Sequence, residues 1–179
     1  MASIVTQEGN QPETNNGHIT LIPKDGVRIL ISKKAAMRSV LLKSMVNLDD
    51  EDGESDQDIP LVNVDSKTLE KIIEFLNHRI INGEMEKVEK PLSKKLSLLV
   101  SPWDHDFISK LKHEELFELI QGSNYLDIKD LLDLSCAQVA SIIKGRTPEE
   151  IRKTFNIVND FTPEEEAQVR EENKWAEDL

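Results

Sequence analysis

The tetrapeptide Thr-Pro-Glu-Glu occurs twice near the end of this chain, at residues 147–150 and 162–165. In each copy the threonine hydroxyl can cap a helix, the proline suits the first helical position, and the second glutamate can reach back to the backbone of the threonine. Helices are therefore predicted to begin at Pro148 and Pro163. This pattern makes the last part of the chain two helices joined by a connecting stretch.

These two helices have few apolar side chains to bury. Ile151 and Phe155 lie four residues apart in the first, and three more apolar residues follow it, Ile157, Val158 and Phe161. The second carries seven acidic residues and one large apolar group, Trp175. Such helices are marginal in water without tertiary contacts, so a partner that receives Trp175 is expected to order the last one.

A longer helix is predicted from about Asp127 to Lys144. Its apolar residues form a broad stripe that consists of Ile128, Leu131, Leu132, Cys136, Val139, Ala140 and Ile143. Leu134 and Ile142 lie off the stripe, so the helix has a second apolar side and needs a second neighbour. Cys136 is interpreted as a small buried hydrophobic residue rather than a nucleophile.

The first half of the chain mixes strands and helices. HITLIP at 18–23 and VRILIS at 27–32 alternate as strands and are joined by a hairpin turn at Lys24-Asp25-Gly26. Ser32 can then cap one or two short helices whose apolar side would hold Ala35, Ala36, Val40, Leu41 and Met45. IPLVNV is predicted to be a third strand. Asp65 or Ser66 caps a further helix with apolar residues at Leu69, Ile72, Ile73, Leu76 and Ile80.

Three segments are predicted to lack regular structure. Residues 1–17 are polar, residues 49–58 contain seven acidic side chains in ten positions, and residues 83–101 alternate Glu and Lys around Pro91. The acidic run is interpreted as a solvated loop; calcium binding is the alternative, although the EF-hand spacing is absent. LSLLV at 96–100 could pack locally.

Charge and cysteine content limit the classes of partner and compartment. With 34 acidic and 22 basic residues the net charge is −12, which repels phosphate backbones and anionic lipid. Direct binding to nucleic acid or membrane is therefore not expected. Cys136 is alone and cannot form an internal disulfide, and no apolar run is long enough to span a bilayer. A soluble protein of a reducing, intracellular compartment is expected.

The sequence has none of the motifs typical of enzymes. It contains no glycine-rich phosphate loop, no nucleophile elbow, no HExxH and no paired-cysteine spacing. Trp103-Asp104-His105-Asp106 with nearby His113 is the one cluster that resembles a metal site, and helix capping or solvation is the alternative. We therefore expect no catalytic residue, no cofactor and no metal.

The run NYLDIKDLLD at 124–133 and the segment 143–179, which holds both Thr-Pro-Glu-Glu copies, closely resemble the S-phase-kinase-associated adaptor family. Its members are the F-box-binding adaptor subunits of SCF cullin–RING ubiquitin ligases, and this chain is similar to fungal ones. The resemblance extends more weakly through GVRILISKKAAMRSVLL, IPLVNV and WDHDF. Where the family commonly has Ala-Ala before the Asn-Tyr pair, this chain has Gly122-Ser123.

The resemblance implies an α+β, mostly helical fold. A BTB/POZ domain at 18–145, with a small three-stranded sheet and flexible loops at 49–58 and 83–101, would precede a C-terminal helical extension at 146–179. The implied function is that of an adaptor that bridges a cullin scaffold to F-box substrate receptors for ubiquitination. The implied partners are F-box proteins and the cullin N-terminal domain.

The resemblance also implies particular binding residues. Asn124 and Tyr125 match the cullin-binding surface, and for Tyr125 a half-buried place in the core is the alternative. Six positions match F-box contacts, namely Leu132, Val139, Ile143, Phe155, Ile157 and Trp175. For Leu132, Val139 and Ile143 the alternative is a role in the internal core. Pro163 matches a proline that some protist relatives hydroxylate, although it is also a sufficient helix start.

Two alternative functions would use the same fold. A self-associating BTB/POZ protein would use the same elements, and a homodimer is expected when no F-box protein is bound. An elongin-C-like adaptor would end near the fifth helix, so residues 147–179 argue against it. Localisation to cytoplasm and nucleus is expected.

Overall fold

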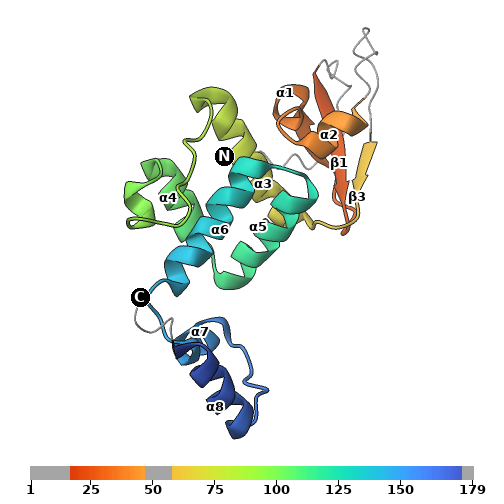
Figure 1. Ribbon diagram of the computed structural model, residues 1–179. Coiled ribbons are helices and arrows are strands. Elements are labelled where there is room, and N and C mark those ends of the chain that lie inside the picture. Colours follow the sequence, from red (N-terminus) through yellow and green to blue (C-terminus); the bar gives the residue numbers. More distant parts are fainter. Residues whose placement is uncertain (1–16, 47–57, 175–179) are drawn as a thin grey trace. The chain divides into compact units, whose positions relative to one another are not determined.

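The computed structural model describes residues 17–46 and 58–174 of the chain. The chain divides into two units, Met1–Ile142 and Ile143–Leu179. The sheet and most helices belong to the first unit, and the last two helices form the second (Figure 1). The expectations for residues 1–16, for most of the acidic run and for Trp175 lie outside the described residues.

The predicted hairpin and third strand are confirmed. β1 (His18–Pro23) pairs antiparallel with β2 (Ile29–Ser32), and Gly26 in the turn takes a positive φ of 76°. β3 (Asp58–Leu61) lies parallel to β1 on its other side, so the strand order is β2-β1-β3. The third strand ends before Val62 and is thus shorter than the apolar run predicted.

Two short helices follow the hairpin, as predicted. Ser32 caps α1 (Lys33–Ala36) and Ser39 caps α2 (Val40–Met45), each by accepting a backbone hydrogen bond through its side-chain oxygen. The break between the helices changes the direction of the second one. Val40 is consequently 60% exposed, and the expectation that it shares the buried side of Ala35 is wrong.

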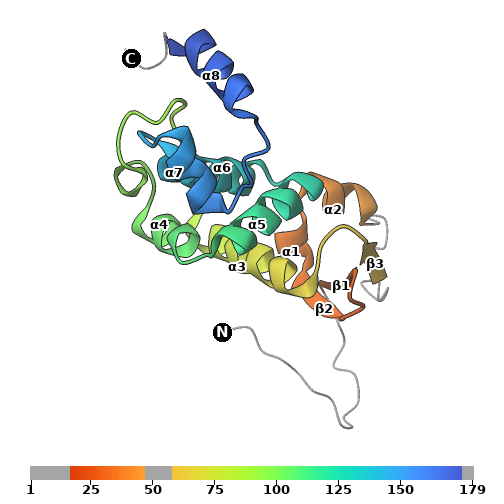
Figure 2. The ribbon, with the colours of Figure 1, turned by 90° about the horizontal axis from the view of Figure 1, so that it is seen from below.

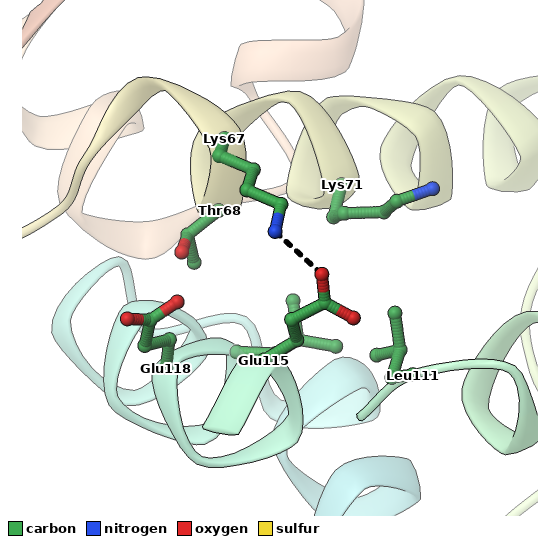
Figure 3. Close-up of a pocket in the computed structure, with 7 residues that line it drawn as sticks. Lys67, Thr68, Lys71, Leu111, Glu115 and Glu118 are labelled. Atoms are coloured by element: carbon green, nitrogen blue, oxygen red, sulfur yellow. Dashed lines mark hydrogen bonds and ion pairs between the residues drawn. The ribbon is translucent and has the colours of Figure 1, made fainter. Parts of the chain in front are cut away.

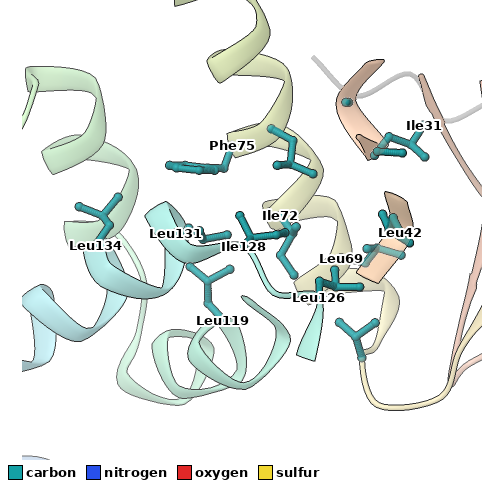
Figure 4. Close-up of a cluster of buried hydrophobic side chains, with 14 of the residues drawn as sticks. Ile31, Leu42, Leu69, Ile72, Phe75, Leu119, Leu126, Ile128, Leu131 and Leu134 are labelled. Carbon is teal, nitrogen blue, oxygen red and sulfur yellow. The ribbon is translucent and has the colours of Figure 1, made fainter. Parts of the chain in front are cut away.

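The helix α3 (Ser66–Asn82) contributes most to the core of the first unit. Asp65 caps it, with the Thr68 N–H donating to its carboxylate at 2.8 Å. The residues buried on this helix are Thr68, Leu69, Ile72, Phe75, Leu76 and Arg79. Figure 4 shows Leu69, Ile72 and Phe75 facing apolar side chains from elements far away in the sequence.

Three further helices complete the first unit. They are α4 (Pro102–Ser109), α5 (His113–Tyr125) and α6 (Lys129–Ile143). Ser101 caps α4, because its hydroxyl accepts a hydrogen bond from the Asp104 N–H at 3.1 Å. Leu119 of α5 and Leu131 of α6 reach the same core as α3 (Figure 4).

The buried side of α6 differs from the predicted one. Leu134, which the pattern put off the main stripe, is fully buried, whereas Cys136, which the pattern put on it, is exposed. Apolar residues occupy most of the circumference of this helix, so its neighbours decide which side is buried. Cys136 is therefore not the buried hydrophobic residue that was predicted.

The segment between α3 and α4 is packed more closely than predicted. Its only regular element is a short 3-10 turn, η1 (Leu96–Leu98). Three of its apolar residues are nevertheless buried, Met85, Val88 and Leu96. The Glu84 carboxylate also pairs with Arg38 at 2.8 Å. These side chains anchor a largely irregular backbone, and the flexibility expected for much of 83–101 stays a prediction.

Candidate functional site

Asn124 and Tyr125 lie in the last turn of α5. Asn124 is exposed, and Tyr125 is half-buried against the core. The next turn runs through Asp127 in the left-handed conformation (φ 50°), and its N–H donates to the Asn124 carbonyl at 3.1 Å. This turn presents Asn124 to solvent from a fixed backbone. The half-burial of Tyr125 fits both the predicted cullin contact and a partial core role.

Ser39 supports this turn from another part of the chain, and the sequence pattern did not single it out. Its hydroxyl is buried and donates to the Leu126 carbonyl at 2.5 Å. The N–H groups of Val40 and Leu41 donate to the carbonyls of Asp127 and Leu126, each at 3.4 Å. The start of α2 is thereby joined to the turn that follows Asn124 and Tyr125.

Gly122 lets α5 approach α3 closely. A Cβ atom at this position would lie 3.0 Å from Cδ1 of Ile72 and 3.1 Å from Cγ2 of Thr68. Ser123 is buried, and its hydroxyl donates to the Ile120 carbonyl at 3.0 Å. The Gly122-Ser123 pair thus faces the interior and leaves the outer side of the turn to Asn124.

α6 carries a second apolar side that its own unit covers incompletely. With 100° between successive residues, Leu132, Cys136, Val139 and Ile143 fall within a sector of about 60°. Leu132 and Val139 are half-buried, and Cys136 is exposed. The centre of this sector lies about 170° from the fully buried Leu134 and about 110° from the fully buried Leu131. Leu132 and Val139 are therefore only partly buried, whereas the alternative of an internal core role would require them to be fully buried.

The second unit begins with α7 (Pro148–Phe155), as the first capping box predicted. The Thr147 hydroxyl accepts from the Glu150 N–H, and the Glu150 carboxylate accepts from the Thr147 N–H at 3.0 Å. Ile151 and Phe155 are half-buried. Beyond α7, three apolar residues are exposed: Ile157, Val158 and Phe161, at 55%, 84% and 46%.

The second capping box is also present, and α8 (Pro163–Glu172) begins with it. No residue of this helix is buried. Two ion pairs join it to α7, Arg152–Glu166 at 3.1 Å and Arg170–Glu149 at 2.7 Å. Pro163 is exposed at the first helical position, so hydroxylation of this residue stays a prediction.

A buried ion pair between α3 and α4 is the main polar feature that the sequence pattern missed. Arg79 donates to Asp104, and both side chains are almost fully buried, at 4% and 2% exposure. The Arg79 guanidinium lies 4.9 Å from the centre of the Phe75 ring and 5.6 Å from that of Trp103. The second Asp104 oxygen accepts from the Ser101 hydroxyl at 2.7 Å. This arrangement makes Asp104 a structural residue.

His78 lies next to this pair and stacks on Trp103, with 3.5 Å between ring centres. Burial, and secondarily the charge of Arg79, holds the pKa of His78 below its usual value. The unfolded chain therefore binds a proton more readily than the folded one. We expect the contribution of this group to stability to be complete above a pH of about 6.5 and to fall as the pH is lowered below it.

Urea unfolding at a series of pH values, with wild type compared to His78→Gln, measures this contribution. In wild type the urea concentration at the unfolding midpoint should fall between neutral and mildly acidic pH. In the variant this fall should be smaller. His18→Gln is the control, because His18 is exposed. Equal pH dependence in all three proteins would contradict the assignment.

The small pocket between α3 and α5 has no room for a substrate. Its volume of about 20 Å³ matches one water molecule. Lys67 Nζ donates to the Glu115 carboxylate at 2.5 Å across its mouth (Figure 3). This hydrogen bond raises the pKa of Lys67 and lowers that of Glu115, so both groups stay charged. The pair resembles a surface ion pair rather than an acid–base site.

Two classes of feature are missing from residues 17–46 and 58–174. No group of three or more His, Cys, Asp or Glu side chains there could hold a metal ion. Nor does this part of the chain contain a helix long and apolar enough to cross a membrane. The described surface also presents an exposed turn at Asn124 and uncovered apolar residues on α6 and after α7.

Comparisons with known proteins give a consistent result. Two family models match the chain: "Skp1 family, tetramerisation domain" at residues 17–80 and "Skp1 family, dimerisation domain" at residues 129–176. An "S-phase kinase-associated protein 1 homolog" from Tetrahymena thermophila is 50% identical over 89% of this chain and 94% of its own length. The "E3 ubiquitin ligase complex SCF subunit sconC" of Arthroderma otae is 46% identical over 92% of this chain and 98% of its own. The protein of the same name from Talaromyces stipitatus is also 46% identical, over 91% and 99%.

Proposed function

This chain belongs to the Skp1 family, and on that premise we propose that it is the adaptor subunit of an SCF-type E3 ubiquitin ligase. It bridges a cullin scaffold to F-box substrate receptors and performs no catalytic step itself. Relatives that match nearly their whole length to this chain are named SCF subunits, which supports the role. The observation that carries the proposal is the uncovered apolar side of α6.

The F-box contact is assigned to apolar residues in both units. Leu132, Val139 and Ile143 supply one stripe along α6, and Phe155 and Ile157 supply apolar area at the end of α7. Burying apolar groups that are partly solvent-exposed in the free chain contributes a binding free energy of about 25 cal/mol per Å² of apolar surface removed from water. Trp175 lies outside the described residues, so its part in the contact rests on the resemblance and on the large area that an indole can bury.

The cullin contact is assigned to Asn124 and Tyr125. An amide that is exposed beside a half-buried phenol combines hydrogen-bonding capacity with apolar area, which is common at the centre of protein interfaces. Both residues sit on a helix end whose backbone is fixed by the turn at Asp127. The two assigned contacts use different elements, so each should be removable without the other.

Replacing Asn124 and Tyr125 together by lysine is expected to weaken cullin binding at least about tenfold, because two charges would enter a desolvated contact. Binding of an F-box segment should be unchanged. Calorimetry with a cullin N-terminal domain and with an F-box segment measures both affinities. Asn77→Lys is a matched control, since Asn77 is an exposed asparagine on α3.

Three outcomes of this experiment separate the readings. Loss of both affinities together with a lower melting temperature would make Tyr125 a core residue, and Asn124→Lys alone then tests the surface. Wild-type protein that binds neither partner would contradict the adaptor role. A stable homodimer in that case would favour the second candidate function, self-association through the exposed apolar residues of α6 and Val158.

Localisation of the chain to both the cytoplasm and the nucleus is part of the proposal. Imaging of the tagged chain in its source cell tests it. Exclusion of the chain from either compartment would contradict this part of the proposal and leave the binding assignments unaffected.

A further inference from the structure

The start of α2, at Ser39 to Leu41, is hydrogen-bonded to the turn after α5, at Leu126 and Asp127. We call this joined surface the ledge. Three hydrogen bonds, from the Ser39 hydroxyl and the N–H groups of Val40 and Leu41, end on the carbonyls of Leu126 and Asp127. Figure 2 shows the end of α5 beside α2. The ledge therefore presents residues from two distant parts of the sequence on one support.

Val40 is the apolar residue that this ledge exposes. Its side chain is 60% exposed, while its N–H is held by the Asp127 carbonyl. An isolated exposed aliphatic residue is common on protein surfaces and needs no special role. Val40 differs from such a residue because its backbone is bonded to the same turn that fixes Asn124 and Tyr125.

The ledge suits a docking surface on physical grounds. Valine is stiff at χ1 because its side chain branches at Cβ, so little rotamer entropy is lost when it is buried. Its backbone and that of Asn124 are fixed by the same network, so their relative position changes little on binding. An exposed apolar side chain on the same hydrogen-bonded support as a half-buried tyrosine suits an interface, where apolar and aromatic area is concentrated at the centre.

We propose that Val40 is a further contact residue for the cullin scaffold, extending the Asn124–Tyr125 surface onto the first turn of α2. The inference rests on the proposed adaptor function and names an additional residue of the same site. The occupant is the partner assigned to Asn124, because the hydrogen bonds to Leu126 and Asp127 make the start of α2 continuous with the turn that follows Asn124.

Val40→Glu tests the assignment with little risk to the fold. The residue is exposed at the first position of α2, where a carboxylate suits the positive end of a helix, and Ser39 keeps its capping role. The variant should bind the cullin N-terminal domain at least about tenfold more weakly, because an unpaired charge would be buried. F-box binding should stay within about twofold of wild type.

Val62→Glu is the matched control. Val62 is a valine that is 69% exposed in the turn after β3, and it makes none of the hydrogen bonds to the turn at Asp127. It should bind the cullin domain within about twofold of wild type. Val40→Ala, which adds no charge, should weaken cullin binding by about threefold.

The outcomes distinguish this inference from the adaptor role. If Asn124→Lys weakens cullin binding while Val40→Glu and Val40→Ala behave like Val62→Glu, the inference is wrong and the adaptor role stands. If wild-type protein does not bind the cullin domain, both are wrong. If Val40→Glu lowers the melting temperature, the Val40→Ala affinity decides.

Discussion

Replacing Asp104 by alanine is expected to lower the free energy of unfolding by about 3–5 kcal/mol, the range found when one partner of a buried ion pair is removed. Arg79 is 4% exposed and donates to Asp104, while its Nε has no partner among the described residues. Without the carboxylate its charge would be buried and uncompensated. The variant would also lose the hydrogen bond from the Ser101 hydroxyl at the start of α4.

Urea unfolding followed by far-ultraviolet circular dichroism measures this loss. Asp106→Ala is the matched control on the same helix, because Asp106 is 66% exposed and pairs with Lys110 at 3.0 Å. It should cost no more than about 0.5 kcal/mol, as expected of a surface pair four residues apart. The double variant Arg79→Met with Asp104→Leu should regain most of the stability, since neither charge is then buried. Equal losses for Asp104→Ala and Asp106→Ala would show that the pair contributes little.

Replacing Val139 by glutamate is expected to weaken F-box binding by about 100-fold or more. Val139 lies on the incompletely covered side of α6, about one turn after Cys136 and one turn before Ile143, and is half-buried. A carboxylate buried there without a partner would cost about 3 kcal/mol, which corresponds to roughly that change in affinity. Calorimetry with an F-box segment measures the effect.

Two further variants separate loss of contact from loss of fold. Ser141→Glu adds the same charge two residues away at an exposed position on another side of α6, and it should bind normally. Cys136→Glu places the charge on the uncovered side at a position that is already exposed, so it should weaken binding without lowering the melting temperature. Normal binding by Cys136→Glu and Val139→Glu would remove this side of α6 from the F-box contact.

Features set by a few neighbouring residues could be predicted from the sequence. The Asp-Gly hairpin, the caps at Ser32 and Asp65 and both Thr-Pro-Glu-Glu boxes appear as predicted, because each depends on hydrogen bonds within three or four residues. The family relationship is confirmed by the matching models and relatives. Local signals and family resemblance thus gave the elements and the function class.

Features set by distant neighbours were predicted less well. The pattern of α6 could not show that Leu134 rather than Cys136 faces the core, since that depends on the position of α3 and α5. Met85 and Val88 have no helical or strand period, so nothing in the sequence indicated their burial. Arg79 does carry a sequence signal, because it follows Ile72 and Phe75 at helical spacing on the buried side of α3.

The candidate binding residues divide in the same way. Asn124, Tyr125 and the six predicted F-box residues were assigned by resemblance, and their roles stay predictions. The structure adds that Asn124 is exposed and that Leu132 and Val139 are half-buried on α6. The contact role proposed for Val40 could not be inferred from the sequence, because the hydrogen bond from Val40 to the turn at Asp127 joins residues far apart in the chain.

The capping boxes of α7 and α8 have a consequence for the speed of partner exchange. Each box closes its hydrogen bonds inside four residues, so the first turn of each helix forms from its own residues, while a partner is still expected to order the end of the last helix. A receptor that meets preformed turns loses less conformational entropy on docking and does not wait for those turns to fold. Association rates of different receptors should therefore be similar, and the lifetime of each complex should decide how long one receptor occupies the chain before the next replaces it.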